Sequence, residues 1–242
     1  MAKDYSALGA VAQPPGCGVW PLINWQDCAQ KANIGHQGRL ELSVSHRQLP
    51  PGQHVPPGRP ALHYGPVPRF DPDRWDLRVF GATDTGTEHR WSWAEFDALA
   101  RTNVVADLHC VTRFSLLDNQ WCGIPAALVL HWMPPAADVT HIMVWAEFGY
   151  CANVALTDFC DPSTVLVTHR AGGRLEAEHG HPVRLVVPHR YAWKSVKWVR
   201  AIEYLTADRR GFWEARGYHN RADPWRAQRY AYQEEPGDGP PA

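Results

Sequence analysis

The stretch Asp107-Leu108-His109-Cys110-Val111-Thr112-Arg113 decides how the rest of the chain is interpreted. A β-branched and apolar run over residues 104–108 predicts a strand that ends immediately before His109 and Cys110. The end of a strand carries side chains to the edge of a sheet, where binding sites are commonly built. His109 and Arg113 would favour the thiolate form of Cys110, which suits a soft or high-valent transition metal. The alternative is a buried cysteine that only fills space.

The segments on either side of this stretch alternate between strand and helix patterns. Ser92 and Glu95 have the spacing of a capping box and predict a short helix through Leu99, and a second helix is predicted over residues 125–132. Further strands are predicted over residues 76–81, 141–148, 183–188 and 195–205. Short strands mixed with short helices indicate an α+β or mixed α/β fold of mixed sheets in a single domain.

The composition indicates one substantial core and suggests three parts. A chain of 242 residues that is 45% hydrophobic can bury one core. Residues 1–48 show little periodicity and are expected to form an irregular N-terminal extension. Residues 49–232 are expected to form the domain, which begins with a Pro-rich stretch over residues 49–75 that also contains glycines and should run extended. Residues 233–242 are expected to be a flexible tail.

The charge and the cysteines exclude several classes of protein. A formal net charge of −1 argues against a chain built as a whole to bind polyanions. No apolar run approaches the roughly 18 residues of a membrane span, and the first residues lack a secretory signal, so a cytoplasmic location is expected. The six cysteines form no Cys-x-x-Cys pair, and reduced thiols are the default in that compartment. A zinc site at Cys17, Cys28, His36 and His46 is disfavoured by its irregular spacing.

The region from Arg184 to Arg216 is locally basic. It holds eight Arg or Lys against three Asp or Glu, which gives a local charge of +5. Because aromatic residues are interleaved with these cations, the region suits an anionic, partly planar ligand. Two alternatives remain open: a solvated strand face with its aromatic side buried, and a surface for single-stranded nucleic acid, which the overall charge makes less attractive.

Four segments in this order resemble the bacterial sulfite oxidase-like oxidoreductases, which carry a molybdenum–molybdopterin cofactor. The match is strengthened by Gly211-Phe212-Trp213-Glu214, Gly217-Tyr218-His219 and Asp223-Pro224-Trp225, and it runs from about Leu49 to Tyr230. The four segments are Leu62-His63-Tyr64-Gly65-Pro66-Val67-Pro68, the Cys110 stretch quoted above, Glu178-His179-Gly180-His181-Pro182-Val183-Arg184-Leu185-Val186-Val187-Pro188, and Trp193-Lys194-Ser195-Val196-Lys197-Trp198.

The resemblance implies a sulfite oxidase-type molybdopterin-binding fold and a role for each matching residue. Cys110 matches the cysteine whose sulfur binds molybdenum. Tyr218 falls at the position of an active-site tyrosine, and Arg113, just after the metal cysteine, is the other residue expected to orient an oxygen atom. The pterin and its phosphate are expected to lie against His63, Tyr64, His179, Arg184, Ser195 and Lys197.

The implied function is two-electron oxygen-atom transfer on a small sulfur-containing substrate, either sulfite-like or sulfoxide-like. Sulfite oxidases have Arg-Asn-His where this chain has Leu62-His63-Tyr64, so an arginine that helps to bind an oxoanion is missing there. The direction of the reaction therefore stays open. The alternative is a non-catalytic molybdopterin-binding or carrier protein. We expect an unknown redox partner, no haem domain in this chain, no nucleic acid and no membrane span.

Overall fold

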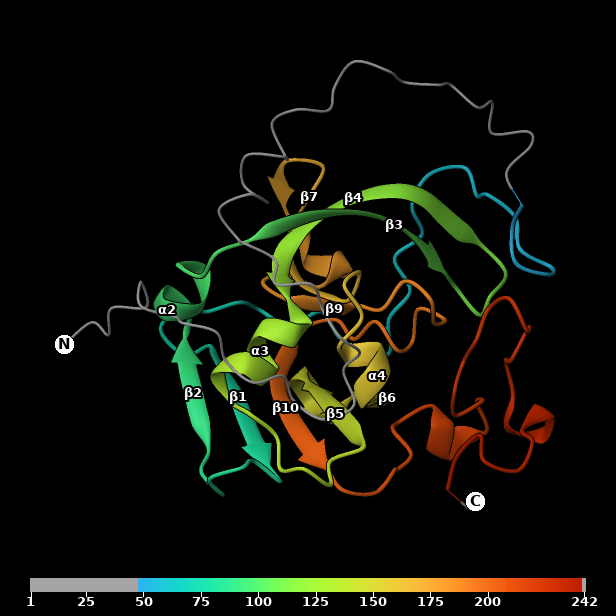
Figure 1. Cartoon of the computed structure of the whole chain (residues 1–242). Helices are drawn as coiled ribbons and strands as arrows, with labels where there is room; N and C mark the ends of the chain where they lie inside the picture. The colour runs from blue at the N-terminus through green and yellow to red at the C-terminus, as the bar shows by residue number, and fades with distance from the viewer. Residues whose placement is uncertain (1–47, 241–242) are drawn as a thin grey trace.

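Two sheets form the frame of the molecule (Figure 1). The computed structural model describes residues 48–240, so the expectations for residues 1–47, the zinc ligands included, lie outside the described residues. The first sheet has the strand order β2-β1-β10-β5-β6. Its strands are β1 (Asp76–Gly81), β2 (His89–Ser92), β5 (His141–Ala146), β6 (Cys151–Ala155) and β10 (Val199–Leu205).

The second sheet has the order β3-β4-β7-β8, with β9 paired to β7. Its long β3–β4 hairpin arches over the top of the molecule in Figure 1. The pairing of β1 with β10 is parallel and the others are antiparallel, which confirms the expected mixed sheets. The strands are β3 (Thr102–His109), β4 (Ser115–Pro125), β7 (Val165–Arg170), β8 (Gly173–Arg174) and β9 (Arg184–Val186).

One hydrophobic core joins the two sheets. Leu77 and Ile202 of the first sheet and Ile124 and Leu185 of the second are fully buried in the same cluster. The short helices cover this core with their own apolar residues. They are α2 (Trp93–Asp97), α3 (Ala126–Trp132) and α4 (Leu156–Phe159), and single 3-10 turns lie at Glu147–Gly149, Ala177–His179, Glu214–Arg216 and Ala231–Gln233.

The local predictions are confirmed where the backbone follows one pattern. Helix α2 begins with the predicted capping box, in which Ser92 and Glu95 bond reciprocally. The strand predicted over residues 195–205 is wrong at its start, because β10 begins at Val199. Trp198 lies in the left-handed region with φ of +56°, which no extended strand can accommodate.

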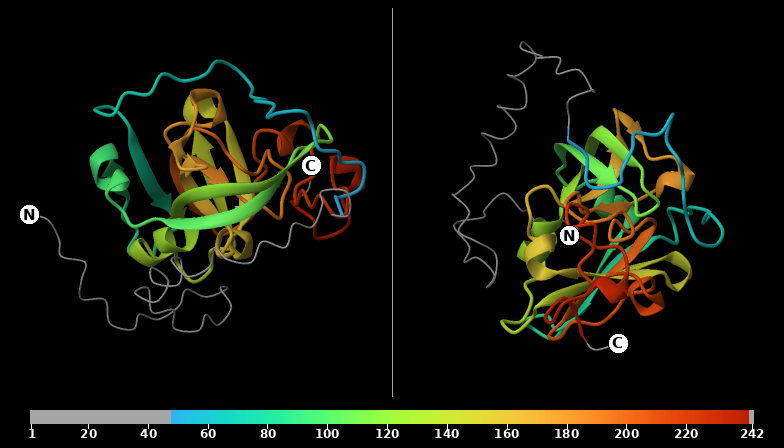
Figure 2. Two further views of the ribbon diagram at one scale, coloured as in Figure 1. Left: turned by 90° about the horizontal axis from the view of Figure 1, so that it is seen from above. Right: turned by 90° about the vertical axis from the view of Figure 1, so that its right-hand side faces the viewer.

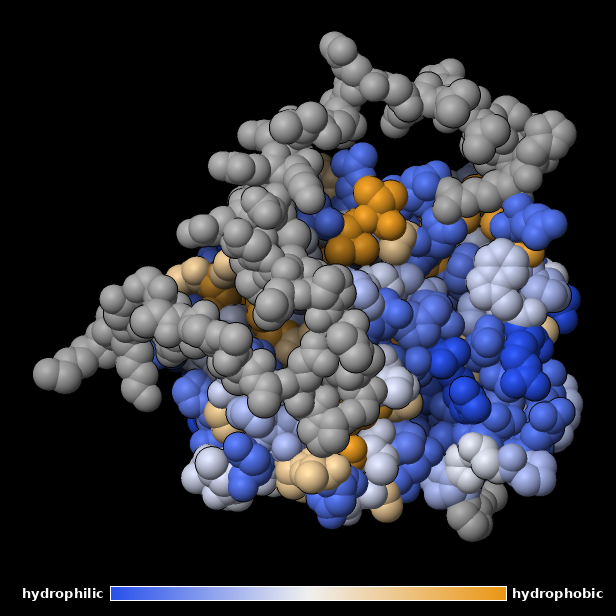
Figure 3. Space-filling model, viewed as in Figure 1, coloured by the Kyte–Doolittle hydropathy of each residue, from blue (hydrophilic) through white to orange (hydrophobic). Residues whose placement is uncertain are grey.

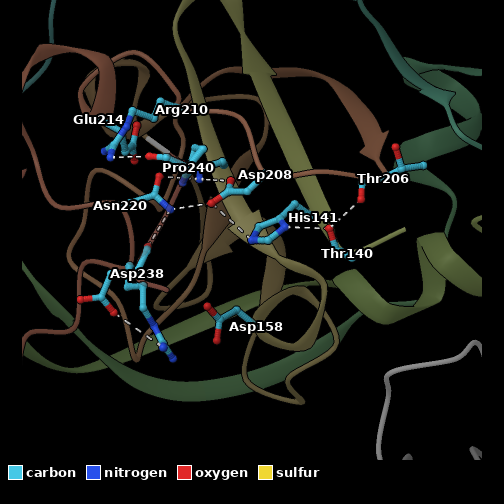
Figure 4. Close-up of polar contacts among 12 residues, drawn as sticks. Thr140, His141, Asp158, Thr206, Asp208, Arg210, Glu214, Asn220, Asp238 and Pro240 are labelled. Atoms are coloured by element: carbon cyan, nitrogen blue, oxygen red, sulfur yellow. Dashed lines mark hydrogen bonds and ion pairs between the residues drawn. The ribbon is translucent and has the colours of Figure 1, made fainter. Parts of the chain in front are cut away.

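The segment after β10 contains no strand within residues 206–240, yet it is well anchored. Arg210 pairs with Glu234 at 2.6 Å and donates to the carbonyl oxygen of Pro240, and the Asn220 amide donates to the carbonyl oxygen of Asp238 (Figure 4). The residues expected as a flexible tail therefore pack against the domain through Pro240. In Figure 3 this side of the molecule is mainly hydrophilic.

The C-terminal segment lies beside the first described residues (Figure 2), and a side-chain bond from Arg229 to Pro51 joins the two. Among residues 48–240, no helix is both long and apolar enough to cross a membrane.

Asp158 of α4 fastens the loop that follows β9. It accepts hydrogen bonds from His189 at 3.0 Å and from two Arg190 nitrogens at 2.8 Å. Burial raises the pKa of Asp158, but these bonds and the positive charge outweigh burial and lower the pKa from 3.8 to about 2. A carboxylate with a lowered pKa stabilises the fold above its ordinary pKa and loses that contribution as the pH falls toward 2.

We therefore expect Asp158→Asn to lower the free energy of unfolding by about 2 kcal/mol at pH 6 and by about 1 kcal/mol at pH 3. Urea unfolding of the wild type and the variant at both pH values measures this difference. Asp138→Asn, at an exposed position, is the control and should change stability by less than about 0.5 kcal/mol. An Asp158→Asn effect that does not depend on pH would contradict the role of the charge.

Candidate functional site

A pocket of about 430 Å³ opens where the second sheet meets the loops that carry the predicted site residues. Its wall is built from segments that are far apart in the sequence, from the Pro-rich stretch to the C-terminal segment. Of the predicted residues it brings together all but one: His63, Tyr64, Cys110, His179, Arg184, Ser195, Lys197 and Tyr218.

Cys110 lies in a tight turn directly after β3. The turn closes through bonds from the Cys110 amide to the Phe114 carbonyl, at 2.8 Å, and from the Arg113 amide to the Cys110 carbonyl, at 3.0 Å. The Cys110 sulfur is 3.1 Å from the Thr112 hydroxyl and contributes to the pocket wall. Arg113 is exposed, has φ of +75° and is not part of that wall. The prediction that Arg113 orients an oxygen atom thus has no support from its position.

Arg184 is the most buried cation of the pocket, at 3% exposure. Its guanidinium donates to the carbonyl oxygens of His179 and Ser195, both at 3.2 Å, and its Nε is buried without a hydrogen-bond partner among the described residues. Burial lowers the pKa of Arg184 to about 10. A buried cation with an unpaired donor is costly unless an anion joins it, so this position fits a phosphate.

Lys197 and the turn at Gly180 complete the cationic end of the pocket. The Lys197 amine donates to the carbonyl oxygens of Leu62 and Glu178, and burial is the main cause that lowers its pKa to about 8. Gly180 has φ of +111°, and a Cβ there would lie 2.9 Å from the Cβ of Arg184. Only glycine lets the His179 turn approach the two cations this closely.

At the cationic end of the pocket, Ser195 is buried and hydrogen-bonded, whereas His179 is half-buried. The Ser195 hydroxyl accepts a bond from the Val187 amide at 2.9 Å and is 2% exposed, so it fixes the loop between β9 and β10. His179 is half-buried, and burial lowers its pKa. A neutral imidazole at neutral pH can both donate to and accept from a polar ligand.

Two further pocket residues, Trp121 and Arg170, were not predicted. The guanidinium carbons of Arg170 and Arg184 each lie 5.5 Å from the centre of the Trp121 ring. Trp121 belongs to β4 and Arg170 to β7, and neither strand was recognised from the sequence. The run Val165-Leu166-Val167, β-branched and apolar, is the signal that could have located Arg170 at a strand end.

Aromatic side chains from the Pro-rich stretch and the C-terminal segment form another part of the pocket wall. Tyr64 contacts Phe212 at 5.0 Å and Trp213 at 5.9 Å between ring centres, so the Pro-rich stretch meets the C-terminal segment there. Tyr218 packs against Trp193 at 5.2 Å and Trp213 at 5.1 Å, and burial raises the pKa of its hydroxyl. We call the part of the wall around Arg184 and Lys197 the cationic end and the part around Tyr218 and Trp213 the aromatic end; Cys110 belongs to the same wall.

The basic region from Arg184 to Arg216 is not one binding surface. Within it, only Arg184 and Lys197 line the pocket among the Arg and Lys residues. Five of the others pair with carboxylates of the described residues, so most of the local +5 is neutralised within the fold. The pairs are Arg190–Asp158, Lys194–Glu214, Arg200–Asp76, Arg209–Glu203 and Arg210–Glu234.

The cysteines of the described residues differ in their bonding state. Cys110, Cys122 and Cys151 are free thiols, and of these only Cys110 lines the pocket. Cys160 is disulfide-bonded, so the expectation of a reduced thiol is wrong at that position. Residues 48–240 contain no group of three or more His, Cys, Asp or Glu that could hold a metal ion by themselves.

Together these features fit a metal that arrives within an organic, phosphate-bearing group. The chain offers one thiol as a metal ligand, a soft donor that suits a transition metal. The unpaired Nε of Arg184 and the amine of Lys197 offer charge and donors to a phosphate. The aromatic end offers flat, apolar surface beside the same sulfur.

Comparisons with known proteins identify this combination. The family model described as "Oxidoreductase molybdopterin binding domain" matches residues 64–213. The uncharacterised oxidoreductase YuiH of Bacillus subtilis (strain 168) is 37% identical over 196 residues, which is 81% of this chain and 98% of that protein. The protein-methionine-sulfoxide reductase catalytic subunit MsrP of Gluconobacter oxydans (strain 621H) is 25% identical over 56% of this chain and 48% of its own length.

Among solved structures, the sulfane dehydrogenase SoxCD of Paracoccus pantotrophus shares the fold. The TM-score is 0.55 at 15% identity, over 85% of this chain and 58% of that chain. The expected sulfite oxidase-type fold of mixed sheets with short helices is thereby confirmed. The chain belongs to the oxidoreductase molybdopterin-binding domain family, the sulfite oxidase-like molybdenum oxidoreductases that its sequence resembles.

Proposed function

We propose that this protein is a molybdenum oxidoreductase that transfers an oxygen atom to or from a small sulfur-containing substrate, with Cys110 as the protein ligand of the metal. The observation that carries the proposal is the common wall shared by Cys110, Tyr218 and Arg184, whose Nε is buried without a hydrogen-bond partner among the described residues. One thiol alone makes a weak metal site, whereas a thiol beside a phosphate site suits a metal held by a pterin.

The residues of the chain divide the work of holding the cofactor. Molybdenum–molybdopterin supplies two-electron oxygen-atom transfer when it is bound. Arg184, Lys197 and His179 would hold its phosphate and polar edge, Cys110 would bind the metal, and His63 and Tyr64 would lie against the pterin. Because the Cys110 turn is closed by backbone bonds, the sulfur is held in place before the cofactor arrives.

The aromatic end of the pocket would receive the substrate. Tyr218 offers a hydroxyl that can donate a hydrogen bond to the oxygen being transferred, which orients it and stabilises developing charge. Phe212 and Trp213 give apolar surface next to that hydroxyl. The apolar rings of Trp193 and Trp213 packed against Tyr218 support a neutral sulfoxide-like substrate over sulfite.

The experiment that tests the function replaces the metal ligand. Protein from cells that make molybdopterin should contain about one molybdenum atom per chain. Cys110→Ser should change the molybdenum electron-spin signal and abolish activity, because a weaker oxygen donor replaces the thiolate. Cys122→Ser, at a half-buried thiol outside the pocket, is the matched control and should behave as the wild type. Identical spectra for Cys110→Ser and wild type would refute the assignment.

The phosphate site can be tested through cofactor content. We expect Arg184→Met to weaken the affinity for the cofactor about 10- to 100-fold, because a charged hydrogen bond to phosphate contributes about 1.5–3 kcal/mol. The purified variant should therefore retain less pterin than the wild type. Arg209→Met removes a cation of the same basic region that is paired with Glu203 and lies outside the pocket. Pterin fluorescence after cofactor extraction measures the content, and equal losses in both variants would argue against a dedicated site.

The substrate and the role of Tyr218 are tested by kinetics with artificial redox dyes. Sulfite oxidation and sulfoxide reduction are assayed side by side, and we expect turnover with sulfoxides. Tyr218→Phe should lower kcat about 10-fold or more with little change in folding, because it removes only the donor. A molybdenum-loaded protein without turnover in either direction would instead indicate a cofactor carrier.

A further inference from the structure

Arg229 of the C-terminal segment reaches the turn that carries Cys110. Its guanidinium donates to the carbonyl oxygen of Val111 at 2.7 Å and to that of Pro51 at 3.0 Å. Val111 is the residue directly after Cys110, so one cation holds both the metal-ligand turn and the first described residues. Arg229 is 8% exposed, although it stands 118 residues away from Val111 in the sequence.

The guanidinium also lies on an aromatic stack that leads into the pocket. It is 4.9 Å from the centre of the Tyr191 ring. Tyr191 is fully buried and stacks on Trp193 at 5.3 Å with an interplanar angle of 13°. Trp193 lines the pocket and contacts Tyr218. Arg229 therefore touches, directly or through one stack, both the Cys110 turn and the aromatic end of the pocket.

Arg229 is supported by a firmly bonded part of the fold. Its amide donates to the Gln233 side chain at 2.9 Å, and its carbonyl accepts from the His219 amide at 3.1 Å. His219 in turn lies 3.5 Å from the Asp238 carboxylate, and Asn220 links that segment to Asp208 (Figure 4). An arginine fixed at both its backbone and its guanidinium loses little freedom when it holds a neighbouring turn.

The charge of Arg229 is the second part of the argument. Arg210 of the same C-terminal segment is half-buried and is neutralised by the carboxylate of Glu234. The hydrogen bonds of the Arg229 guanidinium go to neutral carbonyl oxygens. The arginine–carboxylate ion pairs within the described residues of this segment involve Arg210, Arg221 and Arg226, and none joins Arg229 to a carboxylate. A buried cation without an acidic partner is costly, and an anionic group bound nearby would offset that cost. The exposed Arg113 cannot supply such a buried charge.

We propose that Arg229 is a positioning residue for the Cys110 sulfur, and that its buried charge stabilises the thiolate-bound metal in its reduced, more negative states. The inference rests on the proposed function, because it assumes that Cys110 binds the metal. Two properties follow from it. The Val111 bond keeps the turn in the shape that directs the sulfur into the pocket. The charge raises the reduction potential of the bound metal above the value it would have beside a neutral side chain.

The test compares Arg229→Met, Arg229→Lys and the control Arg226→Met in the molybdenum-loaded full chain. Arg226 belongs to the same segment, but its side chain is 55% exposed and lies near Glu235. We expect Arg229→Met to lower the midpoint potential of the molybdenum couple, measured by redox titration with electron-spin detection. It should also release molybdenum about 10-fold faster on dialysis.

Arg229→Lys keeps the charge but cannot form the forked pair of bonds, so it should restore most of the potential and only part of the metal retention. Arg226→Met should match the wild type in both. Thermal unfolding of each variant shows whether it is folded. If Arg229→Met does not fold, Arg229→Lys alone tests the inference: its midpoint potential should stay near that of the wild type while it releases molybdenum faster.

The outcomes distinguish this inference from the function on which it rests. If the wild type binds no molybdenum, or if Cys110→Ser leaves the metal signal unchanged, the proposed function fails first. If the wild type is loaded through Cys110 while the folded Arg229 variants keep its potential and its release rate, Arg229 is only a structural residue and the present inference is overturned. A shift of potential in Arg226→Met equal to that in Arg229→Met would overturn it as well.

Discussion

The buried positive charge of Arg184 is the constraint on which the pocket depends. A guanidinium at 3% exposure must find partners, and here two carbonyl oxygens serve it while its Nε has none among the described residues. Those carbonyls belong to His179 and Ser195, so the cation ties together the two turns that flank β9. The Nε of Arg184 is therefore the donor that remains for a bound anion. The same side chain thus fixes the local backbone and is the group that we propose binds the cofactor phosphate.

The rest of the site is formed by loops at the ends of the strands. The strands end in turns whose shapes are set by backbone bonds, as at Cys110, or by glycine, as at Gly180. The Pro-rich stretch and the C-terminal segment both contribute to the pocket wall and meet at Tyr64 and Phe212. Neither segment contains a strand that pairs with the sheets. Side-chain hydrogen bonds hold them instead, such as those from Lys197 to the Leu62 carbonyl and from Arg229 to the Pro51 carbonyl.

The fold was predictable where one periodicity ran without interruption. The capping box at Ser92, the strand before Cys110 and the mixed α and β character could be predicted and are confirmed. Strand β4 was missed because Asp118 at positive φ, Asn119 and Gly123 break its alternation, although pairing on both edges extends it over 11 residues. The start of β10 was misplaced because a positive φ at Trp198 is invisible in a hydrophobic pattern.

The family and most of the residues that line the pocket could be predicted from the sequence alone, because the motifs around Cys110, His179 and Lys197 are local patterns; Arg113, Trp121 and Arg170 could not be placed in this way. Tertiary structure decided which charges are available. Most of the basic region is neutralised by carboxylates from distant strands and helices, whereas Arg184 stays unpaired and Arg170 joins it across Trp121. Electrostatic pairing depends on distance in space and on burial, and neither quantity is encoded in the local order of residues.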